Sequence, residues 1–77
     1  MIAPEQSRAA RGWLDWSQVD LAKLAKVSLS TIRDFEKGRR VPIANNLDAI
    51  IRAFEASGVK FEHVDGVATG IGVHRTG

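Results

Sequence analysis

The chain has 77 residues, of which 44% are hydrophobic and 26% charged, with no cysteine and a net charge of +2. This length allows one domain, near the lower size at which a single hydrophobic core is stable, and the lack of cysteine excludes a disulfide framework or a thiolate metal site. No apolar run reaches the length of a membrane span, and the N-terminal residues lack the apolar core of a signal peptide, so we expect a cytoplasmic protein without a membrane partner.

The first predicted helix covers residues 4–14, and Pro4 suits its first position. One face of this helix carries Ser7, Ala10, Arg11 and Leu14. Arginine is unexpected on a face that the pattern directs inward, and two interpretations stay open. Arg11 either forms an ion pair with Glu36, or lays its aliphatic stem over the core while its charged head reaches water.

The sequence predicts the backbone conformation or the exposure of four residues around the end of that helix. Gly12 is unusual inside a helix, where glycine costs about 1 kcal/mol relative to alanine. Asp15 follows the helix, and aspartate tolerates a left-handed backbone better than most residues. We expect Trp13 to be half exposed and Trp16 to pack as a lid over the first two helices, so that both serve packing rather than stacking on bases.

Residues 17–38 predict two short helices joined by a tight corner at residues 25–27. Ser17 and Asp20 form a capping-box pattern at the start of the first helix. The narrow buried stripe of this helix consists of Leu21, Ala22 and Ala25. Helices of this length are marginal in water unless they are packed, so we expect the rest of the chain to support them.

The second short helix, residues 28–37, has one buried and one polar face. Ile32 and Phe35 form the buried pair, and Gly38 is expected to stop the helix in a left-handed conformation. The opposite face carries Leu29, Ser30, Arg33, Asp34 and Lys37. Hydrogen-bonding side chains near the start of a helix suit the major groove of B-DNA, where base edges offer donors and acceptors.

Positive charge is concentrated around this second helix. Residues 23–40 contain six basic and two acidic side chains, whereas the rest of the chain contains five basic and seven acidic ones. This asymmetry is typical of a face directed at phosphates, although an ordinary solvated surface rich in lysine stays open as an alternative. Arg39 and Arg40 lie in the loop after the helix and are candidates for phosphate contact.

A longer amphipathic helix is predicted for residues 45–57, as the floor of the core. Asn45 or Asn46 is expected to cap it, and Gly58 to end it. Its expected buried face consists of Leu47, Ile50, Ile51 and Phe54.

Residues 59–77 predict two strands, residues 59–64 and 71–75, joined by a tight turn at residues 65–66 or by a broader loop. A two-stranded hairpin is marginal unless it packs on something. Its exposed edge either pairs with a second copy of the chain in a two-fold dimer, or the hairpin only packs on the preceding helix. His63 and His74 lack neighbouring ligand or triad residues, so we expect no metal site, no cofactor and no enzyme.

Together these residues resemble the helix-turn-helix domains of the phage repressor/Cro class, the xenobiotic-response-element (XRE) family of bacterial regulators. The pattern covers residues 5–58 and consists of Trp16-Ser17-Gln18, Leu21-Ala22, Ala25, Val27-Ser28, Thr31-Ile32, Phe35-Glu36, Gly38 and Pro42. The resemblance implies a mainly α fold, a compact bundle of four or five helices. In this reading, residues 1–58 are a DNA-binding domain with its motif at residues 17–38, and residues 59–77 are a possible dimerisation element outside the family pattern.

The resemblance also implies roles for individual residues. Base contacts are expected from Leu29, Ser30, Arg33 and Asp34. Phosphate contacts are implied for Gln18 and Ser28, and the charge pattern adds Lys26, Lys37, Arg39 and Arg40. Arg11 and Glu36 occupy the positions of a family ion pair. The chain departs from the family at Asp15 and Lys26, where glycine is common.

The expected function is sequence-specific binding of double-stranded DNA by a small transcriptional regulator of a bacterium, phage or mobile element. A bidentate contact from Arg33 to guanine is worth about 1–3 kcal/mol of discrimination, whereas Asp34 either accepts from cytosine or orients Arg33. One such module buries only about 600–1,000 Å² on DNA, so we expect a homodimeric repressor or autoregulator on a palindromic operator. The rival is a protein-interaction module on the same fold, such as an antitoxin or antiactivator.

Overall fold

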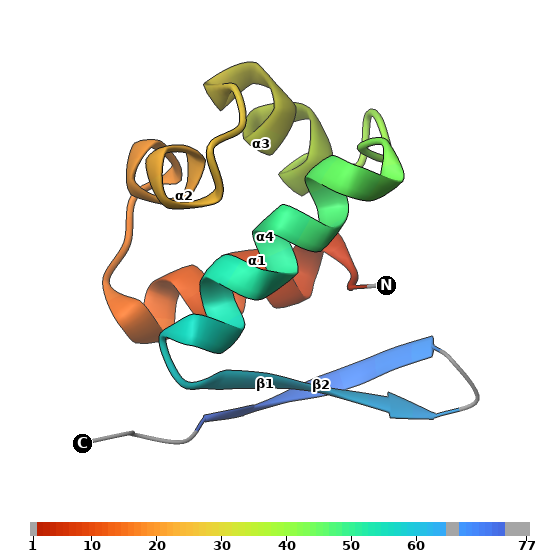
Figure 1. Ribbon diagram of the computed structural model, residues 1–77. Coiled ribbons are helices and arrows are strands. Elements are labelled where there is room, and N and C mark those ends of the chain that lie inside the picture. Colours follow the sequence, from red (N-terminus) through yellow and green to blue (C-terminus); the bar gives the residue numbers. More distant parts are fainter. Residues whose placement is uncertain (1, 65–66, 74–77) are drawn as a thin grey trace.

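A computed structural model describes residues 2–64 and 67–73, with side chains to residue 61. This part of the chain contains α1 Pro4–Leu14, α2 Gln18–Ala25, α3 Leu29–Glu36, α4 Ala44–Ala56, and an antiparallel pair of strands, β1 Val59–Val64 and β2 Val67–Val73. Figure 1 shows α2 and α3 on one side of α1 and α4, with the β1–β2 hairpin on the other. The predicted fold class, a compact helical bundle with a C-terminal strand pair, is confirmed.

The ends of α1 and α2 follow local sequence signals. Pro4 begins α1, and Asp15 ends it in a left-handed conformation with φ of 58°. At the start of α2, the Ser17 hydroxyl accepts from the Asp20 N–H at 3.0 Å and the Asp20 carboxylate accepts from the Ser17 N–H at 2.9 Å. The predicted capping box is therefore present.

The corner between α2 and α3 is formed by Lys26 in a left-handed conformation, with φ of 57°. A non-glycine residue carries a steric cost in this conformation. The lysine nevertheless adopts the left-handed backbone at the position where the resemblance led us to expect glycine. The Ser28 hydroxyl then caps α3 by accepting from the Thr31 N–H at 3.1 Å. Gly38, with φ of 73°, follows α3 and turns the chain away as expected.

The core lies between all four helices and the first strand. Its buried apolar side chains include the predicted Leu21, Ala22, Ala25, Ile32, Phe35, Leu47, Ile50 and Phe54. Trp16 stacks on Phe54 at a centroid distance of 5.6 Å, and Phe61 meets Phe54 in an edge-to-face arrangement at 5.6 Å. Trp16 therefore packs on α4, a contact that the sequence pattern did not indicate. Trp13 is 57% exposed, as predicted.

Ile2 completes the core from a position that sequence patterns did not indicate. Its side chain is only 2% exposed, and together with Phe35, Leu47 and Val41 it lines a small apolar cavity of about 170 Å³. A single apolar residue before the first helix carries no periodicity, so only the three-dimensional packing reveals its burial.

The predicted start of α4 is one residue too late, and its predicted cap is two or three residues too late. The helix begins at Ala44, and its N-cap is Ile43 without a side-chain hydrogen bond, rather than Asn45 or Asn46. The Ile43 carbonyl accepts from the N–H groups of Asn46 and Leu47 at 3.0 Å each. A later start would lose these bonds. Ile51, expected in the buried face, is only partly buried.

The hairpin packs on the bundle and is longer than predicted. β1 lies against α4 and β2 against α1, and Val59 and Phe61 are buried in the core. The strands pair from Val59 with Val73 to Val64 with Val67, with an irregularity between Glu62 and His63. β2 therefore starts at residue 67 instead of 71, because pairing continues to the end of β1. The expected turn at residues 65–66, and His74 and Arg75, lie outside the described residues.

No helix in the described part of the chain is long and apolar enough to cross a membrane. Within those same residues, no group of three or more histidine, cysteine, aspartate or glutamate side chains is placed to hold a metal ion.

Gly12 and Gly38 differ in the sign of φ, and this difference predicts opposite effects of replacement by alanine. A Cβ at either Gly12 or Gly38 would have no neighbour within 4 Å, but only Gly38 has a positive φ. We expect Gly12→Ala to raise the free energy of unfolding by about 0.5–1 kcal/mol. Gly38→Ala should lower it by about 1 kcal/mol, because alanine is strained in the left-handed region.

Urea denaturation of both variants, followed by circular dichroism, measures these differences. A destabilising Gly12→Ala would contradict the open helical site that the structure gives to this residue.

Candidate nucleic-acid interface

Helix α3 presents a polar face at the end of the molecule opposite the hairpin (Figure 1). Its buried face consists of Ile32, Phe35 and Glu36. Of the predicted DNA-contacting residues on its other face, Ser30, Arg33 and Lys37 are exposed, whereas Leu29 and Asp34 are partly buried. Part of Leu29 packs against the core, so only the remainder of this side chain is available to a ligand.

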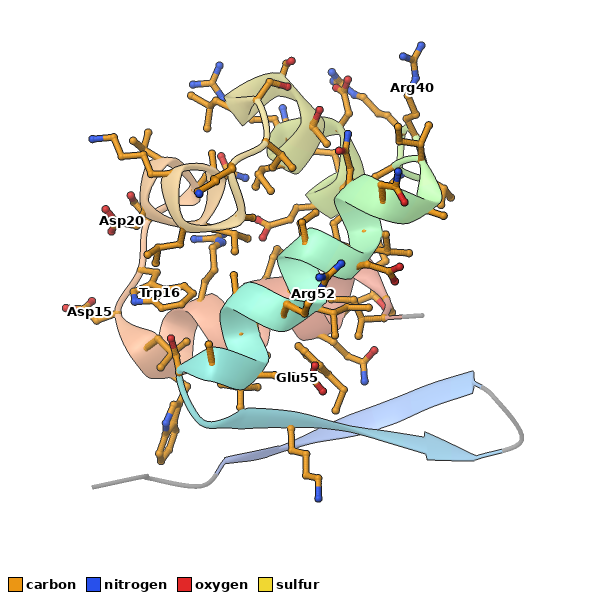
Figure 2. The ribbon with its side chains drawn as sticks, viewed as in Figure 1. Asp15, Trp16, Asp20, Arg40, Arg52 and Glu55 are labelled. Carbon is orange, nitrogen blue, oxygen red and sulfur yellow. The ribbon has the colours of Figure 1, made fainter. Side chains whose placement is uncertain are left out.

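The basic side chains around α3 are free to meet an anion. The ion pairs recorded in the described residues are Arg8–Glu5 and Arg11–Glu36. Neither involves the six exposed bases of residues 23–40, which are Lys23, Lys26, Arg33, Lys37, Arg39 and Arg40. Figure 2 shows Arg40 pointing outward at the top right, above the loop between α3 and α4, while Asp15 and Asp20 lie at the left edge, near the link between α1 and α2. The surface at α3 is therefore positive.

The loop after α3 is held against the last turn of that helix. The Asp34 carbonyl accepts from the N–H groups of Arg39 at 2.9 Å and Arg40 at 3.4 Å. A cleft of about 210 Å³ separates the loop from the helix; it is lined by Ser30, Thr31, Asp34, Arg40, Val41, Pro42, Ile43 and Asn46. Two arginines thus follow the helix in a turn fixed by backbone hydrogen bonds, and Arg40 lines the cleft beside Ser30 and Asp34.

In the described part of the chain, the Asp34 carboxylate and the Arg33 guanidinium do not form an ion pair. Both side chains are therefore available separately, and the role of Asp34 at a base stays a prediction. The Ser28 hydroxyl is already engaged at the start of α3, since it also lies 3.1 Å from the Ser30 hydroxyl and 2.7 Å from that of Thr31. A phosphate contact from Ser28 would have to share this oxygen or use the backbone.

The Glu36 cluster joins α1, α2 and α3 behind the polar face. We use this name for the buried Glu36 carboxylate and its three donors. Arg11 donates from Nη2 to Oε1 at 2.7 Å and from Nε to Oε2 at 2.8 Å. Ser7 donates to Oε2 at 2.6 Å, and Gln18 donates from Nε2 to Oε1 at 3.0 Å. Of the two interpretations of Arg11, the structure thus has the ion pair.

Two more arginine contacts tie the backbone to this cluster. Arg8 donates a hydrogen bond to the backbone carbonyl of Glu36, and Arg11 donates from Nη1 to the Trp16 carbonyl at 3.0 Å. The start of α2 and the end of α3 are consequently fixed to the same helix, α1. The sequence signal for this cluster was Arg11 on the inward face of α1; the parts played by Ser7 and Gln18 were missed.

The pKa of Glu36 is lowered by its hydrogen bonds. Burial alone favours the neutral acid, but the bonds from Arg11, Ser7 and Gln18 and the charge of Arg11 outweigh it, so that the pKa lies below the ordinary 4.5. A group whose pKa is lower in the folded state contributes stability above its unfolded pKa, and this contribution is lost as the pH falls through the folded value.

Because the pKa of Glu36 is lowered in the folded protein, we expect the effect of Ser7→Ala on stability to depend on pH. The variant removes one donor to the charged carboxylate, so it should destabilise the protein by about 1–2 kcal/mol at pH 7. Its cost should shrink as the pH falls through the lowered pKa of Glu36 in the folded protein, where the carboxylate becomes protonated and no longer accepts from Ser7 as an anion. Urea midpoints at pH 7, 4 and 3 measure the difference. A cost that stays constant while the Glu36 carboxyl becomes protonated, as followed by NMR over the same pH range, would show that Ser7 does not support the ionised form.

Comparison with known proteins agrees with this geometry. A family model described as a helix-turn-helix domain matches residues 6–64, which extends through β1 and beyond the residues that carry the sequence pattern. A search among curated proteins found no match.

Proposed function

Because the chain belongs to the helix-turn-helix domain family, a class of DNA-binding modules, we propose that it binds double-stranded DNA sequence-specifically as a small transcriptional regulator. The observation that carries the proposal is the exposed face of α3, where Ser30, Arg33 and Lys37 point away from the core. These three side chains do not contribute to the hydrophobic core. The basic side chains around them have no ion-pair partner within the described residues.

The proposed interface combines phosphate contacts with base contacts. Arg39 and Arg40 after α3, Lys26 at the corner, and Lys37 bind phosphates together with Gln18 and Ser28, which positions the domain without selecting a sequence. Leu29, Ser30, Arg33 and Asp34 contact base edges in the major groove. Arg33 contributes most to selectivity, because a guanidinium can donate two parallel hydrogen bonds to guanine.

The regulator acts as a homodimer on a palindromic operator. A single module of this type buries too little DNA surface for tight specific binding, and a two-fold dimer places two copies of α3 about one helical turn apart. The hairpin supports this assembly, since a two-stranded sheet has an outer edge that can pair with a second copy. The preferred regulatory outcome is repression or autoregulation.

Salt dependence tests the phosphate contacts. A duplex selected from a random library, and a scrambled version of it, are titrated with protein at several salt concentrations. We expect Arg39→Ala/Arg40→Ala to weaken binding of both duplexes by a similar factor and to reduce the slope of log affinity against log salt by about 2. Arg52→Ala, an exposed arginine on α4 (Figure 2), is the control and should leave the slope unchanged. An unchanged slope for the double variant would remove this loop from the interface.

A further inference from the structure

The Glu36 cluster includes one side chain from α2, Gln18, which belongs to the residues proposed to contact DNA phosphates. Three of the four hydrogen bonds to the carboxylate come from Ser7 and Arg11 on α1, and the fourth comes from the Gln18 amide at the first position of α2. Glu36 is 2% exposed and Ser7 is fully buried, whereas Gln18 is only partly buried. Gln18 and the 17% exposed side chain of Arg11 are the two donors of the cluster that also border solvent, and of these two only Gln18 lies on a helix of the predicted motif.

The chemistry of the carboxylate fixes which end of the Gln18 amide faces inward. An ionised carboxylate accepts hydrogen bonds and donates none, and the lowered pKa keeps Glu36 ionised at neutral pH. Each oxygen of Glu36 already accepts from two donors. Rotating the amide by half a turn would place the Gln18 carbonyl against a buried negative charge, so Nε2 is held toward Glu36.

One N–H of Gln18 remains after this bond is made, and it is a donor of the kind that a phosphate requires. The backbone beside it is fixed as well, because Arg11 bridges Glu36 and the Trp16 carbonyl just before the Ser17 cap. An amide held in this way loses little rotamer freedom when it binds, which favours affinity.

We propose that Glu36 is a positioning residue for DNA binding: it holds the Gln18 amide so that the second Nε2–H meets a phosphate at the start of α2, and the Gln18–Glu36 bond persists in the complex. This role rests on the proposed function of the chain. It adds that the side chain joining the three helices also sets the geometry of a phosphate contact.

A double-mutant cycle on DNA affinity separates positioning from simple support of the fold. The variants are Gln18→Ala, Glu36→Gln and both together, in the full chain and with the selected duplex. Glu36→Gln can still accept from Arg11, but its own amide offers both a donor and an acceptor, so it no longer fixes the orientation of Gln18. We expect Glu36→Gln to weaken binding about three- to tenfold when Gln18 is present, and to have no effect on binding when residue 18 is alanine.

Asp48→Asn provides the matched control, because it makes the same carboxylate-to-amide change at an exposed position of α4. It should leave affinity unchanged. If the losses from Gln18→Ala and Glu36→Gln simply multiply in the double variant, Glu36 acts independently of Gln18 and the positioning role is overturned.

A spectroscopic measurement on the wild-type chain keeps the proposal testable if Glu36→Gln does not fold. The two side-chain amide protons of Gln18 are followed by NMR while the selected duplex is added. We expect the proton bonded to Glu36 to keep its resonance and the other to shift. Movement of both, with a change in the Glu36 carboxyl carbon, would mean that Gln18 leaves Glu36 and would overturn the inference while DNA binding stands. A wild-type chain that binds no duplex at low salt would overturn the proposed function itself, and this role with it.

Discussion

Replacing Arg11 with methionine is expected to lower the free energy of unfolding by about 3–5 kcal/mol. Methionine keeps the aliphatic bulk of the side chain but leaves Glu36, which is 2% exposed, without its charged partner. A buried carboxylate that loses its cation costs more than the ion pair contributes, because the desolvation penalty stays. The Trp16 carbonyl also loses its bond from Arg11. Guanidinium denaturation at pH 7 measures the loss.

Arg52→Met is the matched control for this prediction. Arg52 is an exposed arginine on α4, so its replacement should change stability by no more than about 0.5 kcal/mol. If Arg11→Met costs less than 1 kcal/mol, a threshold below the range expected for a broken buried pair, the Glu36 cluster does not hold the three helices together as described.

Arg33→Ala is expected to remove most of the sequence preference while leaving the fold intact. A lost bidentate contact to guanine costs about 1–3 kcal/mol, which corresponds to a five- to 150-fold decrease in the preference for the selected duplex over its scrambled version. Arg33 is exposed and belongs to neither recorded ion pair of the described residues, so the melting temperature should not fall.

Affinities for both duplexes, measured by fluorescence anisotropy for wild type, Arg33→Ala and Arg52→Ala, check this prediction. Arg52→Ala should keep the wild-type preference. Equal weakening on both duplexes by Arg33→Ala would assign Arg33 to a phosphate instead of a base and would shift the search for the specificity residue to Ser30 or Asp34.

Local signals made the four helices and the ends of the first three predictable. Helix ends depend on contacts with backbone groups only a few residues away, so the neighbouring sequence is enough to predict them. The examples here are Ser17 with Asp20, Ser28, and Gly38. The exposed face of α3 followed in the same way from the positions of Ile32 and Phe35, because a helix that buries two residues on one side must present the others.

Features that depend on tertiary packing were harder to predict. The start of α4 at Ala44 follows from the Ile43 carbonyl rather than from an asparagine side chain, and the burial of Ile2 depends on a cavity built by α3, α4 and their loop. The role of Gln18 in the Glu36 cluster depends on two helices meeting at the right angle. No spacing along one helix encodes that meeting, although Arg11 on an inward face indicated Glu36 as a partner.

The most direct test of the account is the binding of wild-type protein to the DNA upstream of its own gene. Fluorescence anisotropy of that duplex and of a scrambled duplex is measured at two salt concentrations. We expect preferential binding to the upstream duplex that persists at the higher salt, with a saturation stoichiometry of two chains per site. Weak and equal binding to both duplexes, abolished by moderate salt, would contradict sequence-specific autoregulation through α3.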